Sequence, residues 1–250
     1  MAAVHPAADL PDLPLRQQLV AVARRMNASG INQGTSGNLS ARIPGGMLIT
    51  PSSLPYERME PADLVAIDLQ GRPLAMDHGL AEMRAADFGA GPAARRPSSE
   101  WRLHADILAS RPELEAVLHC HSTHATALAC HGRAIPPFHY MTAVAGGDDI
   151  RCAPYATFGT AELSQLAVQA LEGRQACLLA QHGQVTAGRD LDQALRLAIE
   201  VETLARMYLQ ALQLGEPPLL SAEQMAAVHH QFRTLLYGAA DPAAEAPAAG

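Results

Sequence analysis

The sequence feature that most constrains the fold is a short apolar run, residues 116–118, that leads directly into His119-Cys120-His121. Ala, Val and Leu in succession predict a buried β-strand. Successive side chains of a strand point to opposite faces, so His119 and His121 are expected on one side and Cys120 on the other. Two buried imidazoles need hydrogen-bond partners or a shared metal ion. The pair therefore predicts either a polar core contact or two metal ligands.

A second apolar run supplies a third histidine. Residues 178–180 are followed by Gln181, His182 and Gly183, and the glycine is expected to turn the chain. Three histidine ligands leave one coordination position open, as in catalytic rather than structural zinc sites. We therefore predict that His182 joins the first two histidines in a catalytic metal centre.

Length and composition indicate a globular protein of one domain. The chain has 250 residues, of which 48% are hydrophobic and 17% charged, enough to bury a substantial core. A net charge of −7 argues against nucleic-acid binding, which needs a basic surface. No apolar segment approaches the ~20 residues that span a bilayer, and the N-terminus lacks a secretory signal pattern. The cysteines form no Cys-x-x-Cys pair, so we expect reduced thiols in a cytoplasmic protein.

Periodic apolar residues predict alternating helices and strands. Helices are expected at residues 14–27, 98–108, 122–129, 161–171, 190–209 and 221–235. Strands are expected at residues 39–43, 47–50, 64–69, 115–120, 175–180 and 185–187, the first two as a hairpin. Residues 135–141 are expected to be extended. We predict flexible tails at residues 1–13 and 238–250, one domain over residues 14–237, and an extended surface loop at residues 72–97.

Three hydroxyl-rich segments are candidates for an anion site. They are residues 34–42, residues 50–56 and the pair Ser98-Ser99. Small residues in succession can present backbone N–H groups to an anion, and a helix N-terminus attracts phosphate. The alternative is ordinary turn and cap chemistry, with Ser98 or Ser99 as the N-cap and Glu100 in the first helical turn.

Acid–base candidates lie close to these segments. His104 follows Glu100 by one helical turn on the same face, and it either orients the carboxylate or packs as a core histidine. Tyr140 keeps its proton at neutral pH because its normal pKa is near 10. It is therefore a candidate proton donor, or else an amphipathic tyrosine at an interface.

Several motifs together make the sequence similar to a known family. They are Gln33-Gly34-Thr35-Ser36-Gly37-Asn38, Ile49-Thr50-Pro51, Ser98-Ser99-Glu100-Trp101, His119-Cys120-His121, His139-Tyr140-Met141, Ala153-Pro154-Tyr155-Ala156-Thr157-Phe158-Gly159-Thr160 and His182-Gly183. From about Leu15 to Phe232 the chain resembles the class II aldolase/adducin-domain family. The resemblance implies a three-layer α/β domain with a central, largely antiparallel sheet flanked by helices. It also implies a homotetramer with four-fold symmetry and sites between subunits.

The resemblance implies a role for each candidate residue. The three histidines would bind one divalent metal ion per subunit, most often Zn²⁺, with Mn²⁺ or Co²⁺ as alternatives. Glu100 would be the catalytic base and would bind the metal when substrate is absent, while Tyr140 would act on the aldehyde oxygen in a neighbouring subunit. The residues at phosphate-binding positions are Gly37, Asn38, Ser52, Ser53, Ser98 and Ser99. Those on the aldehyde side are Phe158, Phe232 and Tyr237.

The chain departs from the family pattern in three places. Ser53 stands where a related enzyme has glycine, a change that keeps the backbone N–H available to phosphate. The 72–97 segment is longer than its counterpart. Phe232 aligns with a C-terminal aromatic residue of the family, whereas Tyr237 is displaced. The last two departures concern the aldehyde half of the substrate and not the phosphoketone half.

The implied activity is reversible cleavage of a ketose 1-phosphate, such as L-fuculose 1-phosphate, to dihydroxyacetone phosphate and an aldehyde through a metal-stabilised enediolate. The alternative is an aldolase or dehydratase acting on 5-deoxyribulose 1-phosphate or methylthioribulose 1-phosphate. Pentulose-phosphate 4-epimerases have aspartate at the position of Glu100, which favours the aldolases. A non-catalytic, adducin-like interaction domain would not need all three histidines, and a carbonic-anhydrase-type hydratase would not need the phosphate segments.

Overall fold

The computed structural model describes residues 10–74 and 95–235. Most of the predicted tails, the central part of the 72–97 loop and Tyr237 therefore lie outside the described residues. Helix α1 begins at Leu13, one residue before the expected start. Residues 135–139 precede the 3₁₀ helix η5 (Tyr140–Ala145), so the segment expected to be extended as far as residue 141 ends two residues earlier.

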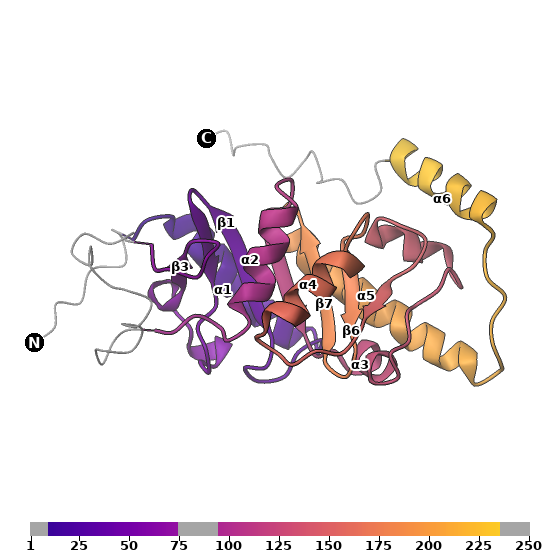
Figure 1. The fold of residues 1–250 in the computed structure, drawn as a ribbon, viewed down its shortest axis with the longest axis horizontal. Coiled ribbons are helices and arrows are strands. Elements are labelled where there is room, and N and C mark those ends of the chain that lie inside the picture. Colours follow the sequence, from indigo (N-terminus) through magenta and orange to yellow (C-terminus); the bar gives the residue numbers. More distant parts are fainter. Residues whose placement is uncertain (1–9, 75–94, 236–250) are drawn as a thin grey trace, which may run out of the picture.

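A seven-stranded sheet forms the middle layer of the domain (Figure 1). Its strand order is β3-β2-β1-β4-β7-β6-β5, and every neighbouring pair is antiparallel except β5 and β6. The strands are β1 (Asn38–Ile43), β2 (Gly46–Ile49), β3 (Val65–Ile67), β4 (Ala116–Cys120), β5 (Arg151–Ala153), β6 (Ala176–Leu179) and β7 (Gly183–Gly188). The prediction of a largely antiparallel sheet in one α/β domain is confirmed.

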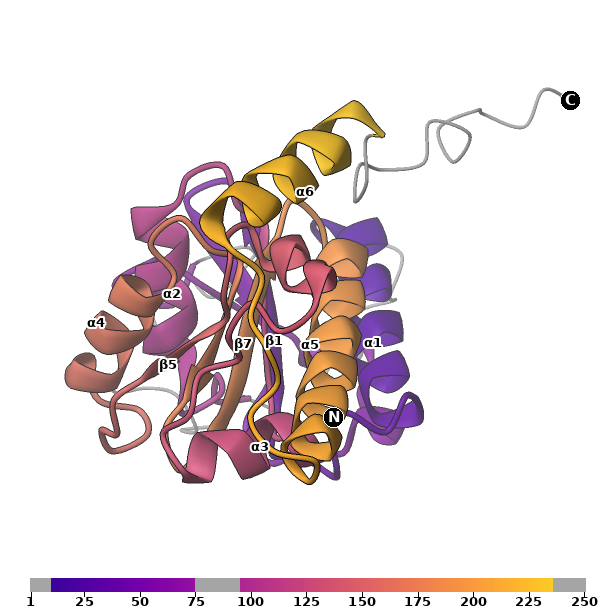
Figure 2. The same cartoon turned by 90° about the vertical axis from the view of Figure 1, so that its right-hand side faces the viewer.

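Helices cover both faces of the sheet. Helices α2 and α4 lie on one face and α1 and α5 on the other, while α6 crosses near one end and packs against η5 (Figure 2). The α-helices are α1 (Leu13–Ala28), α2 (Trp101–Ser110), α3 (Thr123–Cys130), α4 (Ala161–Ala170), α5 (Leu191–Leu212) and α6 (Ala222–Thr234). Two further 3₁₀ helices are η2 (Tyr56–Arg58) and η3 (Pro61–Asp63). No described helix combines the length and apolar character needed to cross a lipid bilayer.

Alternation along the strands builds a separate apolar core on each face of the sheet. Buried residues that pack with α1 and α5 include Leu39, Leu48 and Leu118. Those that pack with α2 and α4 include Met47, Ile49 and Val117. Each strand therefore sends every second side chain to the same layer, and the face of a polar residue follows from its apolar neighbours.

Candidate metal centre

The position of His119 follows from the alternation in β4. Leu118 and Cys120 pack in the core beside α1, whereas Val117 packs in the core beside α2. His119 shares the face of Val117 and is fully buried there. His121 follows the last residue of the strand and projects to the same side, with its Nε2 atom 3.0 Å from Nε2 of His119. The predicted separation of Cys120 from the two histidines is confirmed.

His182 is delivered by the turn between β6 and β7. The residue that reverses the chain is Gln181, whose φ of 52° lies in the left-handed region. The expectation that Gly183 turns the chain is therefore wrong, because Gly183 is already the first residue of β7. Glycine is needed there for space: an added Cβ would lie 2.6 Å from the carbonyl oxygen of Cys120 and 2.9 Å from Cδ2 of His121.

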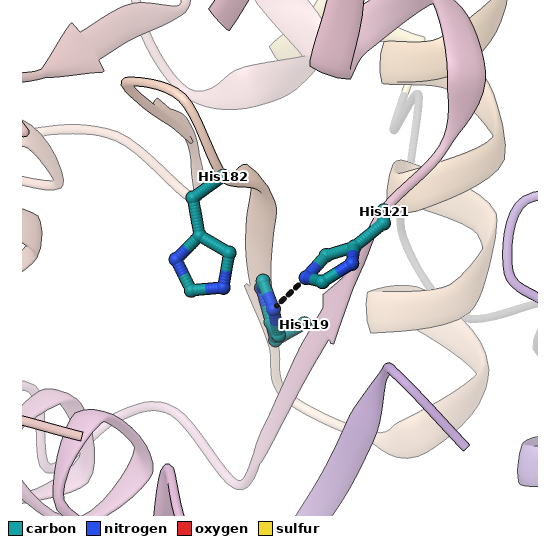
Figure 3. A group of neighbouring side chains, drawn as sticks. All are labelled: His119, His121 and His182. Carbon is teal, nitrogen blue, oxygen red and sulfur yellow. Dashed lines mark hydrogen bonds between the residues drawn. The ribbon is translucent and has the colours of Figure 1, made fainter. Parts of the chain in front are cut away.

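The three imidazoles converge from the end of β4 and from the turn between β6 and β7 (Figure 3). One ligand atom from each ring lies within 4.8 Å of the others. Nδ1 of His119 lies 2.9 Å from the carbonyl oxygen of Gln184, which can only accept, so Nδ1 carries the proton. Nε2 of His119 therefore directs a lone pair toward the other two rings. This is the arrangement by which a second hydrogen bond orients a metal-binding histidine.

Glu100 completes the cluster from the start of α2. It occupies the N-cap position but makes no capping hydrogen bond with its side chain. The expectation that Ser98 or Ser99 is the N-cap is therefore wrong; the Ser98 hydroxyl instead accepts from the Glu100 N–H at 3.3 Å. The two carboxylate oxygens lie 3.3 Å from Nε2 of His119 and of His182.

One carboxylate oxygen of Glu100 indicates whether a metal ion fits among these residues. Oε1 of Glu100 is buried and has no hydrogen-bond partner in the described structure. A buried carboxylate oxygen without a partner is rare in native proteins. This oxygen lies 3.3 Å from Nε2 of His182, and Nε2 of His119, which carries a lone pair, lies 3.3 Å from the other oxygen, Oε2. A divalent cation held beside the carboxylate would satisfy both the unpartnered oxygen and the lone pair. The donor set of three imidazoles and one carboxylate fits a divalent metal such as Zn²⁺.

The electrostatics keep the histidines neutral and the carboxylate charged. Burial lowers the pKa of His119 and of His121, and burial with the neighbouring His119 lowers the pKa of His182 to about 4. Burial alone would raise the pKa of Glu100, but His119, His182 and a hydrogen bond from Asn38 outweigh it and hold that pKa below its usual value. Neutral imidazoles and an ionised carboxylate are the protonation states that bind a metal.

Asn38 and His104 form a buried layer behind Glu100. Nδ2 of Asn38 donates to Oε2 of Glu100 at 2.9 Å, and Oδ1 of Asn38 lies 2.5 Å from Nε2 of His104. His104 in turn contacts the hydroxyl of Ser40 through Nδ1 at 2.7 Å. His104 is therefore a buried core histidine that reaches the carboxylate only through Asn38. Ser40 was not predicted; its signal is the Asn38-x-Ser40 spacing, which places both side chains on one face of a strand.

The buried His104 predicts a pH dependence of stability. Burial lowers its pKa to about 3, whereas an unfolded histidine titrates near 6.5. Between these values the unfolded chain binds a proton that the folded chain excludes, so the free energy of unfolding falls as pH drops through this window and is fully retained above it. We expect His104→Gln to flatten this slope by up to about 1.4 kcal/mol per pH unit, measured by urea unfolding between about pH 7.5 and about pH 5.5. Equal slopes in the two proteins would contradict a buried, neutral imidazole.

A pocket of about 420 Å³ opens beside Glu100, His121 and His182. All the residues predicted to bind phosphate line it: Gly37, Asn38, Ser52, Ser53, Ser98 and Ser99. Gly37 has no room for a Cβ, which would lie 2.7 Å from the carbonyl oxygen of His119. The pocket is also lined by Thr35 and Ser36, which belong to the first hydroxyl-rich segment, and by Tyr155 and Gln181, which were not predicted to be site residues. No lysine or arginine is among the described residues that line it, so hydroxyls, backbone N–H groups and the α2 N-terminus are the groups available to an anion.

Ser53 adopts a strained conformation at the edge of this pocket. Its φ of 60° lies in the left-handed region, which costs a non-glycine residue about 1–2 kcal/mol. Glycine relieves that strain but loses about 0.5–1 kcal/mol more conformational freedom on folding. We therefore expect Ser53→Gly to raise the free energy of unfolding by up to about 1 kcal/mol, measured by urea denaturation. Ser52→Gly is the matched control and should lower it; a loss of stability in Ser53→Gly would contradict the assigned strain.

The aromatic candidates divide into two groups. Phe158 lines the pocket and is largely exposed. Tyr140 does not line the pocket of its own chain; its ring packs edge-on against Phe232 of α6, with ring centroids 6.3 Å apart. Tyr140 also packs against His139. Tyr237 lies outside the described residues. The structure therefore brings together the metal, base and phosphate candidates, but it leaves Tyr140 and Phe232 at a separate surface.

Known proteins share this fold and these motifs. Residues 17–209 match the family model described as the Class II Aldolase and Adducin N-terminal domain. A 5-methylthioribulose-1-phosphate/5-deoxyribulose-1-phosphate aldolase of Rhodospirillum rubrum is 50% identical over 222 residues, which are 89% of this chain and 92% of that protein. An L-fuculose phosphate aldolase of Escherichia coli K12 is 43% identical over 221 residues, or 88% and 94% of the two proteins. A solved L-fuculose 1-phosphate aldolase aligns with a TM-score of 0.79 at 34% identity, covering 90% of this chain and 98% of that one.

The chain therefore belongs to the class II aldolase and adducin family, and the resemblance predicted from the motifs is confirmed. Within that family it is a class II aldolase, an aldehyde-lyase that works with a divalent metal ion. The three converging histidines are the residues among those described that could hold such an ion.

Proposed function

We propose that the protein cleaves a ketose 1-phosphate reversibly to dihydroxyacetone phosphate and an aldehyde. The observation that carries the proposal is a buried Glu100 carboxylate placed between two of three converging histidines, at the wall of a hydroxyl-lined pocket. A metal group alone is compatible with many reactions. Its combination with a pocket lined by hydroxyl groups that can hold a phosphate, and with a carboxylate that can accept a proton, fits the cleavage of a sugar phosphate.

In this proposal, His119, His121 and His182 hold one divalent ion, with Zn²⁺ preferred and Mn²⁺ or Co²⁺ as alternatives. Glu100 contributes a fourth ligand when substrate is absent. The ion supplies Lewis-acid stabilisation of the negative charge that develops on the phosphoketone half of the substrate. Every other step is assigned to side chains of the protein.

The proposed role of Glu100 is proton transfer at carbon. In the synthetic direction its carboxylate removes a proton from C3 of dihydroxyacetone phosphate, and C3 then bonds to the aldehyde carbon. Tyr140 of a neighbouring subunit gives its proton to the aldehyde oxygen, which becomes the C4 hydroxyl. In cleavage Tyr140 takes the proton of the C4 hydroxyl and Glu100 gives its proton to C3. After a turnover in either direction, exchange with solvent water moves one proton back between the two groups and restores their starting states.

The proposed phosphate site consists of Gly37, Asn38, Ser52, Ser53, Ser98 and Ser99. Hydroxyls and backbone N–H groups hold the phosphate, and the positive end of the α2 dipole favours its negative charge. The backbone N–H of Ser52 and that of Ser98 already donate to Arg96 and Thr50, so these two serines contribute their hydroxyls. A phosphate held in this way orients the ketone toward the metal centre.

The aromatic cluster of His139, Tyr140 and Phe232 supports a symmetric assembly. Tyr140 is 47% exposed and lies away from the pocket of its own chain, so its proposed role requires a second subunit. We propose a four-fold homotetramer in which Tyr140, Phe232 and Tyr237 serve a neighbour's pocket, and Phe158 its own. One catalytic domain over residues 14–237 and a cytoplasmic location complete the proposal; the four free cysteines suit a reducing compartment.

Two classes of substrate are candidates. The first is L-fuculose 1-phosphate, which would release L-lactaldehyde; an L-fuculose phosphate is the substrate named for the Escherichia coli relative. The second candidate is a 5-deoxyribulose or 5-methylthioribulose 1-phosphate, favoured by the higher identity to the Rhodospirillum rubrum aldolase. Both share the phosphoketone half and differ only on the aldehyde side.

The test is a panel of these three ketose 1-phosphates with the metal-loaded protein. Released dihydroxyacetone phosphate is measured by coupled reduction with NADH, with and without a chelator. We expect cleavage that the chelator abolishes and that added Zn²⁺ restores. Cleavage that persists in chelator, or no cleavage of any member by metal-loaded protein, would contradict the proposal.

A further inference from the structure

A ladder of polar side chains leads from Glu100 into the protein. Asn38 and Ser40 are two residues apart on β1 and face α2, whereas Leu39 between them packs in the core beside α1. Glu100 and His104 are four residues apart at the start of α2. Two residues along a strand and four along a helix both cover about 6–7 Å. Asn38 and Ser40 on β1 are therefore spaced to match Glu100 and His104 on α2, where the sheet packs against this helix.

The direction of every hydrogen bond in this ladder follows from Glu100. Its ionised carboxylate can only accept, so Nδ2 of Asn38 must face it and Oδ1 must face away. Oδ1 can only accept, so Nε2 of His104 must carry the proton and donate. Nδ1 of His104 then has only a lone pair, and the hydroxyl of Ser40 must donate to it. Only one set of tautomer, amide orientation and hydroxyl rotamer satisfies all three contacts.

The inner part of the ladder is closed to water, and only its outer end, at Asn38 and Glu100, borders the pocket. His104 and Ser40 have no exposed surface, and Asn38 is 3% exposed. A polar group in such a place has no alternative partner, so each member holds the next in one orientation. The Asn38 amide is therefore not free to rotate toward the pocket, and its N–H group is committed to Oε2 of Glu100.

We propose that Ser40 and His104 are positioning residues that hold the Glu100 carboxylate, through Asn38, in the orientation needed for proton transfer. The inference rests on the proposed function. Asn38 secures Oε2, so Oε1, which has no hydrogen-bond partner, is the oxygen left to exchange a proton with the substrate. Without the imidazole, the amide of Asn38 can rotate and the carboxylate can leave its position beside His119 and His182.

The experiment isolates the proton-transfer step. Metal-loaded protein is incubated with dihydroxyacetone phosphate alone in D₂O, and deuterium incorporation at C3 is followed by NMR; no aldehyde and no neighbouring tyrosine chemistry is needed. The variants are His104→Leu, which removes both ring nitrogens, and His104→Gln, whose amide N–H can still reach Asn38. Ser164→Ala is the matched control, because it removes another fully buried hydroxyl that packs against the same helix α2.

We expect His104→Leu to slow exchange roughly 10- to 100-fold, as for removal of other groups that orient active-site ligands. The kcat for cleavage should fall in parallel, with KM and metal content unchanged. His104→Gln should recover most of the rate, and Ser164→Ala should match the wild type. If His104→Leu does not fold, Ser40→Ala provides the same test with an expected several-fold loss.

Three outcomes would overturn the inference. They are wild-type exchange in both His104→Leu and Ser40→Ala, a His104→Gln variant as slow as His104→Leu, and a loss of rate that only follows loss of metal. Absence of exchange in the wild-type protein would overturn the proposed function and this inference with it. Exchange that is fast in both the wild type and His104→Leu would instead leave the proposed function standing.

Discussion

Replacing Glu100 with glutamine is expected to reduce turnover by roughly 10²-fold or more while the protein keeps its metal. Glutamine has the shape of glutamate and can still accept the hydrogen bond from Asn38, so the surrounding packing is preserved. It cannot accept a proton, so the step at C3 of the substrate loses its base. The three histidines remain, and three ligands are sufficient for a catalytic zinc site.

The measurement combines kcat for ketose 1-phosphate cleavage with metal content by mass spectrometry. Glu113→Gln is a suitable control, because Glu113 is exposed, forms a surface ion pair with Arg111 and is not among the described residues that line the pocket. Turnover of the Glu100→Gln variant at the wild-type rate would show that another group is the base. Loss of metal equal to the loss of turnover would show that Glu100 acts chiefly as a ligand.

The histidines and the sheet could be predicted because the responsible patterns are local. A period of two in residues 116–121 is enough to separate Cys120 from its neighbours, and the structure confirms that separation. The apolar run before His182 likewise identifies a buried strand that ends at the site. The family resemblance added the largely antiparallel arrangement of the sheet, which periodicity alone does not contain.

Other features depended on contacts between distant parts of the chain. Serine at a helix start normally indicates an N-cap. Here Glu100 occupies the N-cap position, and its side chain contacts the histidines instead of capping the helix. The contact of Ser40 with His104 could be predicted only by knowing which face of β1 carries Ser40 and how α2 is positioned along that strand. The spacing of residues within β1 or within α2 does not give this relation. Tyr140 illustrates a further case, because the pocket proposed for it belongs to a second subunit, and no pattern within one chain can test that role.

Gly183, after the turn before β7, was correctly predicted to matter for the site, but for the wrong structural reason. Glycine after His182 was expected to supply a left-handed turn, but Gln181 adopts that conformation instead, with φ of 52°. The requirement at Gly183 is the close approach of β7 to the end of β4, where His119 is paired with Val185 and Cys120 with Gln184. Backbone proximity of this kind depends on strand pairing and is invisible in the sequence.

Gly183→Ala is therefore expected to weaken metal binding. The new methyl group would lie 2.6 Å from the carbonyl oxygen of Cys120, 2.9 Å from Cδ2 of His121 and 3.3 Å from Cε1 of His119. The carbonyl belongs to a strand and cannot yield without separating β4 from β7, so the rings of His121 and His119 are displaced. Misplaced ligands weaken a site that requires near-ideal metal–ligand distances. We expect at least a ~10-fold loss of metal affinity, of the size seen when groups that orient ligands are removed, and a parallel loss of activity.

Gly173→Ala separates this effect from the general cost of replacing a glycine. Gly173 has a φ of 66° and an added Cβ there would meet no atom within 4 Å, so alanine introduces only backbone strain. That variant should lose about 1 kcal/mol of stability and keep its metal and its turnover. Metal affinity is measured by competition with a chromophoric chelator, and unfolding by urea. If Gly183→Ala binds metal as tightly as Gly173→Ala does, the two strands tolerate the methyl group and the three imidazoles are not held in place by their close approach.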